Sequence, residues 1–180
     1  MAAVHRLFVA IRPPEAIRDL LVDAMDDSAD FRWQTDEQLH LTLRFIGEIE
    51  RPVANDLAGA LTRVRADRFQ LRIAGVDRFE QRSSGTLWAG VEAKAPVAAL
   101  AAKIERACVG VGLEPEHRAF HPHITLARWK GRRTREIRDF LERTGGLTSE
   151  PFDIDSFVLF ESQLSRHGAH YEAVATYPLN

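Results

Sequence analysis

The hydrophobic positions of the chain form two kinds of segment: short apolar or alternating runs, and longer stretches with helical spacing. Runs typical of buried or half-buried strands cover residues 7–11, 38–46, 69–79, 87–91, 120–129, 152–162 and 171–179. Helical spacing of apolar residues covers residues 16–25, 52–64, 96–109 and 134–143. Strands and helices of these lengths, mixed along one chain, predict an α+β fold.

Local breaks in this pattern predict turns and irregularities. Gly47 is expected to end the strand over 38–46, and Gly75 predicts a bulge or bend inside the run 69–79. The last two strand runs predict a hairpin whose turn lies within residues 164–169.

The order of elements repeats once. The first strand, the helix proline and a His-x-Thr triplet recur at offsets of 80, 82 and 83 residues, from 7 to 87, from 14 to 96 and from 40 to 123. Near-constant offsets predict an internal duplication of a strand–helix–strand–helix–strand unit. We expect one domain over residues 1–180, with two lobes related by a pseudo-twofold axis and built from about 5–80 and 86–180. Each lobe would be a mainly antiparallel sheet with helices packed outside, joined through residues 81–85, with an active-site cleft between the lobes.

Composition narrows the class of protein. The chain has 180 residues, 45% of them hydrophobic and 28% charged, which is ordinary for a globular domain. The net charge of −2 argues against a global field for long nucleic acids. A single cysteine, Cys108, excludes an internal disulfide framework and a Cys-rich zinc site. No run approaches about 18 apolar residues, so we expect no membrane contact and a cytoplasmic location.

The repeated triplet is the strongest candidate for chemistry. It reads His40-Leu41-Thr42 in the first unit and His123-Ile124-Thr125 in the second. Residues at i and i+2 of a strand point to the same face, so each copy places an imidazole beside a hydroxyl. A structural His–Thr pair copied by duplication is the alternative, but buried polar groups are costly when they serve no purpose. Two such strands facing each other supply one base, one acid and two hydroxyl donors.

These motifs resemble those of a known family. The stretches 40–47 (HLTLRFIG) and 120–128 (FHPHITLAR) are similar to the two signature motifs of the two-histidine phosphoesterases. Within that superfamily the chain most resembles the LigT-like RNA 2′,3′-cyclic phosphodiesterases, formerly called 2′-5′ RNA ligases. The opening run 7–11, the motif spacing and the stretch 159–162 (LFES) extend the resemblance over nearly the whole chain.

The resemblance implies hydrolysis of a 2′,3′-cyclic phosphate to a 2′-phosphomonoester, with His40 as proton donor and His123 as proton acceptor. The residues alone do not distinguish the two roles, because the repeat makes them nearly interchangeable. Histidine suits both, since its unperturbed pKa is about 6.5. Thr42 and Thr125 would donate to the non-bridging phosphate oxygens. No cofactor and no metal are then required, and reverse ligation remains permitted.

Other residues are weaker candidates for substrate binding. Arg128 matches the family motif and could anchor phosphate, although strict alternation places it on the face opposite His123. Phe45 has the corresponding place in the first motif and is expected in the core. His121 shares the parity of His123 and is expected to line the cleft, while Pro122 predicts a strand start. Phe120 and the tryptophans at 33 and 129 could stack a base, but packing in the core or at the rim is favoured.

Several functional alternatives remain open. The same four residues would serve another phosphodiester, such as a 2′-5′ oligonucleotide or a nucleotide-derived cyclic phosphate. A non-catalytic protein that binds RNA ends, and a zinc hydrolase using His40, His121 and His123, are alternatives from other classes. The expected partners are RNA 2′,3′-cyclic phosphate ends or small cyclic nucleotides, with no protein partner and a monomeric state. The basic stretch 128–135 would guide a longer strand or form an ordinary charged start of a helix.

Overall fold

The computed structural model describes residues 2–180 and confirms the α+β fold. Its elements, in chain order, are β1 (Val4–Ile11), α1 (Glu15–Ala24), β2 (Arg32–Trp33), the 3-10 turn η1 (Asp36–Gln38), β3 (Leu41–Glu50), α2 (Arg51–Leu61), β4 (Phe69–Gln81), β5 (Ser84–Glu92), α3 (Lys94–Gly110), β6 (His123–Lys130), α4 (Thr134–Thr144), β7 (Phe152–Ile154), β8 (Ser156–Ser165) and β9 (Gly168–Pro178). Each predicted helix is present within a few residues of its expected bounds. Among the described residues, no helix is long and apolar enough to cross a membrane.

The strands form one curled sheet in the order β7-β4-β5-β6-β3-β1-β8-β9, with β2 added beside β6. Every pairing is antiparallel. β3 and β6 meet through a single residue pair, Leu41 and Ile124, at the centre of this order. The sheet therefore consists of two halves, β4-β5-β6 and β3-β1-β8, joined at one point.

The halves do not correspond to the two halves of the sequence, which differs from the predicted lobe boundaries. β4, the last strand of the first repeat unit, pairs with β5, and β8, the last of the second unit, pairs with β1. Each unit thus completes its three-stranded half with a strand from the other unit. Residues 81–85 form the tight turn of the β4–β5 hairpin, where Gln81 pairs with Ser84, and do not link two lobes. The alternating pattern cannot show this exchange, because it identifies strands but not their neighbours.

Two glycines were predicted to interrupt strands, and the structure confirms only one of these predictions. The β4–β5 register shifts between Ile73 and Val76, and Gly75 in this shift has a φ of 81°, which confirms the predicted bulge. Gly47, with a φ of 84°, lies at a register shift in the β1–β3 pairing rather than at the end of the strand. β3 continues to Glu50, so the prediction that Gly47 closes the strand is wrong. The β8–β9 hairpin turns between Ser165 and Gly168, inside the predicted segment.

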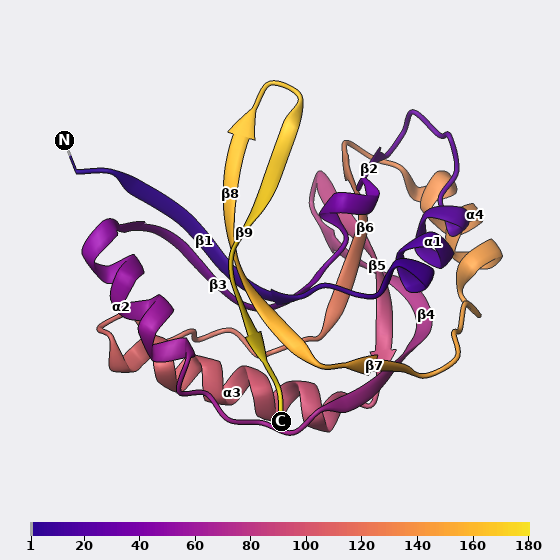
Figure 1. Cartoon of the computed structure of the whole chain (residues 1–180). Coiled ribbons are helices and arrows are strands. Elements are labelled where there is room, and N and C mark those ends of the chain that lie inside the picture. The colour runs from indigo at the N-terminus through magenta and orange to yellow at the C-terminus, as the bar shows by residue number, and fades with distance from the viewer. Residues whose placement is uncertain (1) are drawn as a thin grey trace.

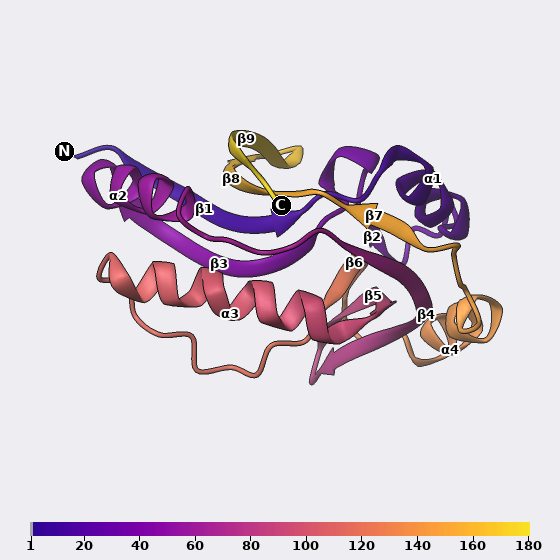
Figure 2. The ribbon, with the colours of Figure 1, turned by 60° about the horizontal axis from the view of Figure 1, so that its bottom comes forward.

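The main core lies between the sheet and its helices. α3 runs along β3 and contacts α2, whereas α4 contacts β4 and lies with α1 at the other end of the molecule (Figure 2). Leu41 and Ile124 at the central join are both 1% exposed and belong to this core. A second, small apolar cluster of Phe8, Ala10, Val158 and Phe160 lies apart from it on β1 and β8.

Candidate active site

The join between β3 and β6 brings the two triplets together. In an antiparallel pair, residues directly opposite each other point to the same face, and both members of the Leu41–Ile124 pair point into the core. The positions on either side of this pair therefore point to the other face. The register places residue 40 opposite 125 and residue 42 opposite 123. The four side chains predicted to be catalytic share this face and are all half-buried: His40, Thr42, His123 and Thr125.

Backbone carbonyls fix the orientation of both imidazoles. The Nδ1 atom of His40 lies 2.7 Å from the carbonyl oxygen of Gln38, and that of His123 lies 2.6 Å from the carbonyl oxygen of His121. A carbonyl oxygen only accepts, so each Nδ1 carries the hydrogen and each Nε2 is left for the cleft. The Nε2 atom of His40 lies 3.0 Å from Oγ1 of Thr42, whose hydroxyl donates to it when the ring is neutral. Both rings thus present the same nitrogen to a ligand.

His40 lies in an apolar enclosure. Its ring is 4.8 Å from that of Phe8 and 5.3 Å, edge to face, from that of Tyr171 on β9. Burial lowers the pKa of His40 to about 4; the carbonyl of Gln38 opposes this, and the positive charges of Arg128 and His123 lower it further. His40 is therefore neutral in the free protein at neutral pH.

His123 has a similar but more open environment. Its ring lies 5.0 Å from Phe79 and 5.8 Å from Trp88, with His121 nearby at 6.3 Å. Burial lowers the pKa of His123, the carbonyl of His121 opposes this, and the charges of His121 and Arg128 lower it further. The positive charge of Arg128 therefore lowers the pKa of both histidines.

Arg128 reaches the cleft because β6 contains a bulge. The β5–β6 register shifts between Leu87 and Trp88, so that Leu126 has no partner in β5, and both Leu126 and Ala127 are buried. The extra residue reverses the alternation beyond it and turns Arg128 to the face of His123 and Thr125. The prediction that alternation places Arg128 on the opposite face is therefore wrong.

Phe45 is turned outward by a matching bulge in β3. The β1–β3 register shifts between Val9 and Ala10, and the consecutive residues Leu43 and Arg44 are both buried. Phe45 is consequently 41% exposed, with the guanidinium of Arg6 5.4 Å from its ring centroid. The expectation that Phe45 packs in the core is wrong for the same reason as that for Arg128.

A cavity of about 620 Å³ lies beside Thr42 and His123. His121 lines it as expected. Phe120, for which packing in the core or at the rim was favoured, also lines the cavity and is 38% exposed. Phe45 and Phe79 also line it, so three partly exposed phenylalanines surround this end of the site. Such a lining suits the flat apolar faces of a nucleobase or ribose.

The two candidate tryptophans have structural roles. Trp129 is 4% exposed and packs against Phe31, in agreement with the preference for core packing. Trp33 lies against Phe31 and Phe140, and its indole N–H donates to the carbonyl of Ser28 at 3.1 Å. Pro122 immediately precedes β6, as its ring predicts.

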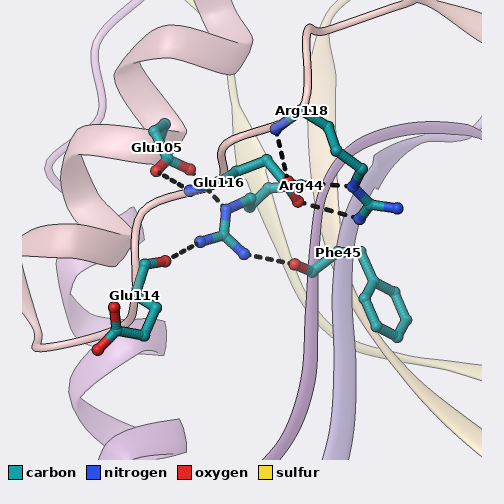
Figure 3. A network of polar contacts seen from close by, with 6 residues as sticks. All are labelled: Arg44, Phe45, Glu105, Glu114, Glu116 and Arg118. Carbon is teal, nitrogen blue, oxygen red and sulfur yellow. Dashed lines mark hydrogen bonds and ion pairs between the residues drawn. The ribbon is translucent and has the colours of Figure 1, made fainter.

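A polar network under the cavity holds the loop that leads into β6 (Figure 3). Arg44, 9% exposed, forms an ion pair with Glu105 of α3 at 2.5 Å and donates to the carbonyls of Phe45 and Glu114. The other oxygen of Glu105 accepts the backbone N–H of Glu116 at 2.9 Å. Burial opposes ionisation of Glu105, but these two partners outweigh it and lower its pKa. The network thus links β3, α3 and the residues just before His121.

The zinc alternative needs metal-binding side chains that lie close together. Within residues 2–180, no three His, Cys, Asp or Glu side chains are arranged so that they could hold a metal ion. The rings of His121 and His123 are 6.3 Å apart, and the ring of His121 lies 5.2 Å from that of Phe79 and 5.3 Å from that of Trp88. The zinc alternative therefore finds no set of ligands in the described residues.

The four aromatic side chains around the histidines were missed by the sequence analysis. Phe8 and Trp88 are 80 residues apart and Phe79 and Phe160 are 81 apart, close to the repeat offset, so alignment of the two units could have found them. In both halves the two rings lie together, Phe8 with Phe160 at 5.2 Å and Phe79 with Trp88 at 4.9 Å. Tyr171, a fifth aromatic residue, has no such signal because β9 lies outside the repeat.

Comparison with known proteins agrees with this geometry. The profile of the 2′-5′ RNA ligase superfamily matches residues 12–166. An Aeropyrum pernix protein named RNA 2′,3′-cyclic phosphodiesterase is 34% identical over 142 residues, covering 77% of this chain and 81% of its own length. A protein of the same name from Thermus thermophilus is 31% identical over 186 residues, covering 97% and 90% of the two chains.

Solved structures show the same fold. The crystal structure of E. coli LigT complexed with 3′-AMP aligns with a TM-score of 0.83 and 23% identity, covering 99% of both chains. The sequence profile alone matches well over half of the residues. The chain therefore belongs to the 2′-5′ RNA ligase superfamily.

Proposed function

We propose that this protein hydrolyses RNA or nucleoside 2′,3′-cyclic phosphates to 2′-phosphomonoesters, without a metal, by acid–base catalysis between His40 and His123. The observation that carries the proposal is the convergence of two His–Thr pairs on one face of the sheet, with each Nδ1 held by a carbonyl. The names of the Aeropyrum and Thermus relatives support the substrate class.

The reaction is an in-line displacement at phosphorus. A water oxygen attacks phosphorus while Nε2 of His123 takes a proton from that water. The bond from phosphorus to O3′ breaks, and O3′ takes the proton carried by Nε2 of His40. The products are a 3′-hydroxyl and a 2′-phosphomonoester, and each proton transfer contributes roughly 10²- to 10⁴-fold.

The groups around the histidines stabilise the charge on phosphorus. Thr42 and Thr125 lie one on each strand and donate their hydroxyl hydrogens to non-bridging oxygens. Arg128, turned to this face by the bulge, supplies a positive charge that acts on both imidazoles. The ribose and base of the terminal nucleoside lie in the cavity lined by Phe45, Phe79 and Phe120.

The protonation states require the substrate. The pKa of His40 is about 4 in the free protein, so a donor at this position must gain its proton as the anion binds. A phosphodiester anion beside the ring offsets the effects of burial and of Arg128 and favours the imidazolium. Binding of substrate or product should therefore be accompanied by proton uptake at neutral pH.

A phosphodiesterase acting on another small substrate is the second candidate. The cavity of about 620 Å³ and the four catalytic side chains would serve a 2′-5′ oligonucleotide equally well. A non-catalytic protein that binds RNA ends would need neither two oriented Nε2 atoms nor two paired hydroxyls.

The test is turnover of a nucleoside 2′,3′-cyclic phosphate in excess EDTA, with identification of the monophosphate formed. We expect the 2′-phosphate, at a rate indifferent to EDTA and lower by at least about 10²-fold in His40→Ala and in His123→Ala. Loss of wild-type activity in EDTA, restored by added metal, would overturn the metal-free proposal. Folded wild-type protein without turnover on this substrate would favour the second candidate or the binding role.

A further inference from the structure

A second cavity, of about 750 Å³, lies at the other end of the active site and is lined differently from the first. On one side of the join between β3 and β6, residues of β3 and of the loop before β6 line the apolar cavity. On the other side, residues of β6 and β2 line the second cavity. The second cavity is bounded by the outer part of β6, by β2 and by the β4–β5 turn, with Arg128 and Phe79 on the side of the catalytic groups. Phe79 lines both cavities, so the two cavities adjoin at this ring.

The floor of this second cavity carries cations in adjacent positions of the sheet. Arg32 on β2 is directly opposite Arg128 on β6, and Lys130 lies two residues further along β6 on the same face. All three are exposed, while Ala127 and Trp129 between them are buried. Like charges directly opposite each other in a sheet destabilise it, so this placement is not explained by folding.

Neutral donors complete the floor. On the other side of β6, Thr86 is opposite Arg128 and Ser84 is opposite Lys130, both on β5. Gly85 between them lies against the indole of Trp129, where an added Cβ would approach within 2.1 Å, so no side chain projects there. The result is a surface of cations and hydroxyls, the kind of surface that binds phosphate oxygens.

The carboxylate nearest to this surface is already paired. Asp30 lines the cavity but forms an ion pair with Arg133 at 3.3 Å and accepts the hydroxyl of Ser28. In the part of the chain that the structure describes, no ion pair and no side-chain hydrogen bond is formed by Arg32, Arg128 or Lys130. The positive charge of the floor is therefore available to a ligand.

We infer that the pair Arg32 and Lys130, with Thr86, forms a second phosphate site, which holds the phosphate on O5′ of the terminal nucleoside. This inference rests on the proposed function, because the cyclic phosphate must lie at the histidines for the next phosphate to lie here. That next phosphate is the first internucleotide linkage of an RNA strand. The substrate is then an RNA end rather than a free cyclic mononucleotide, and the strand leaves over β2 and the end of β6.

The test compares kcat/KM for three substrates: a nucleoside 2′,3′-cyclic phosphate with a free 5′-hydroxyl, the same compound with a 5′-phosphate, and a dinucleotide that ends in the cyclic phosphate. Wild-type protein should prefer the dinucleotide to the first compound by about tenfold or more, since charge-assisted contacts to phosphate are strong. In the double variant Arg32→Gln and Lys130→Gln this ratio should fall toward one, while kcat/KM for the first compound stays within about twofold. The slope of log kcat/KM against log salt for the dinucleotide should decrease by at most about 0.7, the value expected when contact to one phosphate of a single strand is lost.

Arg106→Gln is the matched control. Arg106 is an exposed cation on α3, and its loss changes the net charge by the same amount as the single change Arg32→Gln without touching the cavity. If it lowers the dinucleotide ratio as much as a single Arg32→Gln change, the effect is one of net charge and the assignment is wrong. Equal gains from the 5′-phosphate and from the dinucleotide, with no further gain for a trinucleotide, would show a phosphate site without an RNA strand as its specific occupant.

Failure of the proposed function gives a different result. Wild-type protein would then turn over none of the three compounds, and the site is tested by binding of a labelled RNA tetranucleotide with a 3′-phosphate. Weaker binding by Arg32→Gln, but not by Arg106→Gln, would support the second phosphate site in the absence of catalysis. Equal binding by all three proteins would overturn it.

Discussion

The two halves of the site start from nearly the same sequence and reach different environments. Each has a His-x-Thr triplet, a bulge directly after it and a pair of aromatic rings beside the imidazole. In the first half, Tyr171 of β9 packs edge to face against His40. Gln38 holds the β8–β9 hairpin next to His40 by donating to the carbonyl of Ala169 at 2.7 Å. In the second half His123 is bordered by the exposed His121.

This difference makes two equivalent histidines chemically distinct. Closer enclosure by apolar rings penalises the imidazolium more strongly at His40, whose pKa is about 4. The bulges also end in different residues, Phe45 in one half and Arg128 in the other, so one end of the site is apolar and the other is basic. Duplication followed by asymmetric surroundings thus gives two histidines with different pKa values from one motif, and the assignment of His40 as the acid depends on the bound phosphate anion.

The sharpest way to test the comparison is to remove each histidine and vary the leaving group. His40→Ala and His123→Ala should each lower kcat/KM for the cyclic phosphate by about 10² to 10⁴-fold. With a nitrophenyl phosphodiester, whose leaving group needs no proton, the variant that lacks the acid should regain most of the loss and the variant that lacks the base should not. We expect recovery in His40→Ala. Recovery in His123→Ala instead would reverse the two roles while leaving the mechanism intact.

Removal of the hydroxyl of Thr42 should affect the pH–rate profile differently from removal of that of Thr125. Thr42→Val and Thr125→Val each remove a donor to the phosphate oxygens, and we expect losses in kcat of about 10²-fold. Thr42 also contacts Nε2 of His40, so Thr42→Val should additionally move the acidic limb of the pH–rate profile, which Thr125→Val should leave in place. Thr→Ser changes at the same positions keep the hydroxyl and serve as controls. A profile moved equally by both valine variants would contradict this distinction.

The network behind the first triplet should matter for stability rather than for chemistry. Arg44→Met leaves the carboxylate of Glu105 without its main partner and frees the carbonyl of Glu114, and we expect a loss of about 2 to 4 kcal/mol. Arg72→Met is the control, because the ion pair of Arg72 with Glu92 is exposed and such pairs contribute about 0 to 1 kcal/mol. Chemical denaturation of both variants measures the difference. Equal losses would mean that the network under the cavity contributes no more than a surface pair.

An effect of similar size is expected in the pH dependence of stability. The pKa of His40 falls from 6.5 in the unfolded chain to about 4 in the folded protein, so the unfolded state binds its proton first as the pH falls. The stability gained from a neutral His40 is thus complete above pH 6.5 and decreases down to about pH 4, with a slope of at most about 1.4 kcal/mol per pH unit. Denaturation at several pH values, compared with His40→Gln, isolates this term. A variant that keeps the full slope between pH 6.5 and 4.5 would show that other groups cause it.

Much of the fold and of the site was predictable from local pattern. The alternation of apolar residues located nearly all strands, and the spacing at 16–25, 52–64, 96–109 and 134–143 located the helices. The four catalytic candidates were predictable because the motif recurs at a near-constant offset. Parity within each triplet holds on the sheet, since no bulge falls between the histidine and the threonine. His121 lines the cleft as its parity with His123 indicated.

The sequence pattern does not show the bulge that begins directly after each threonine. A bulge depends on the partner strand, so the turns of Phe45 and Arg128 toward the cleft have no local signal. The exchange of β4 and β8 between the halves is likewise a matter of pairing, which alternation does not encode. Arg32 is 96 positions from Arg128 in sequence and becomes its neighbour only because β2 pairs with β6. The sequence by itself determined which side chains are available for the chemistry; the tertiary structure decided which of them meet, because strand register and bulges arise from contacts between distant segments.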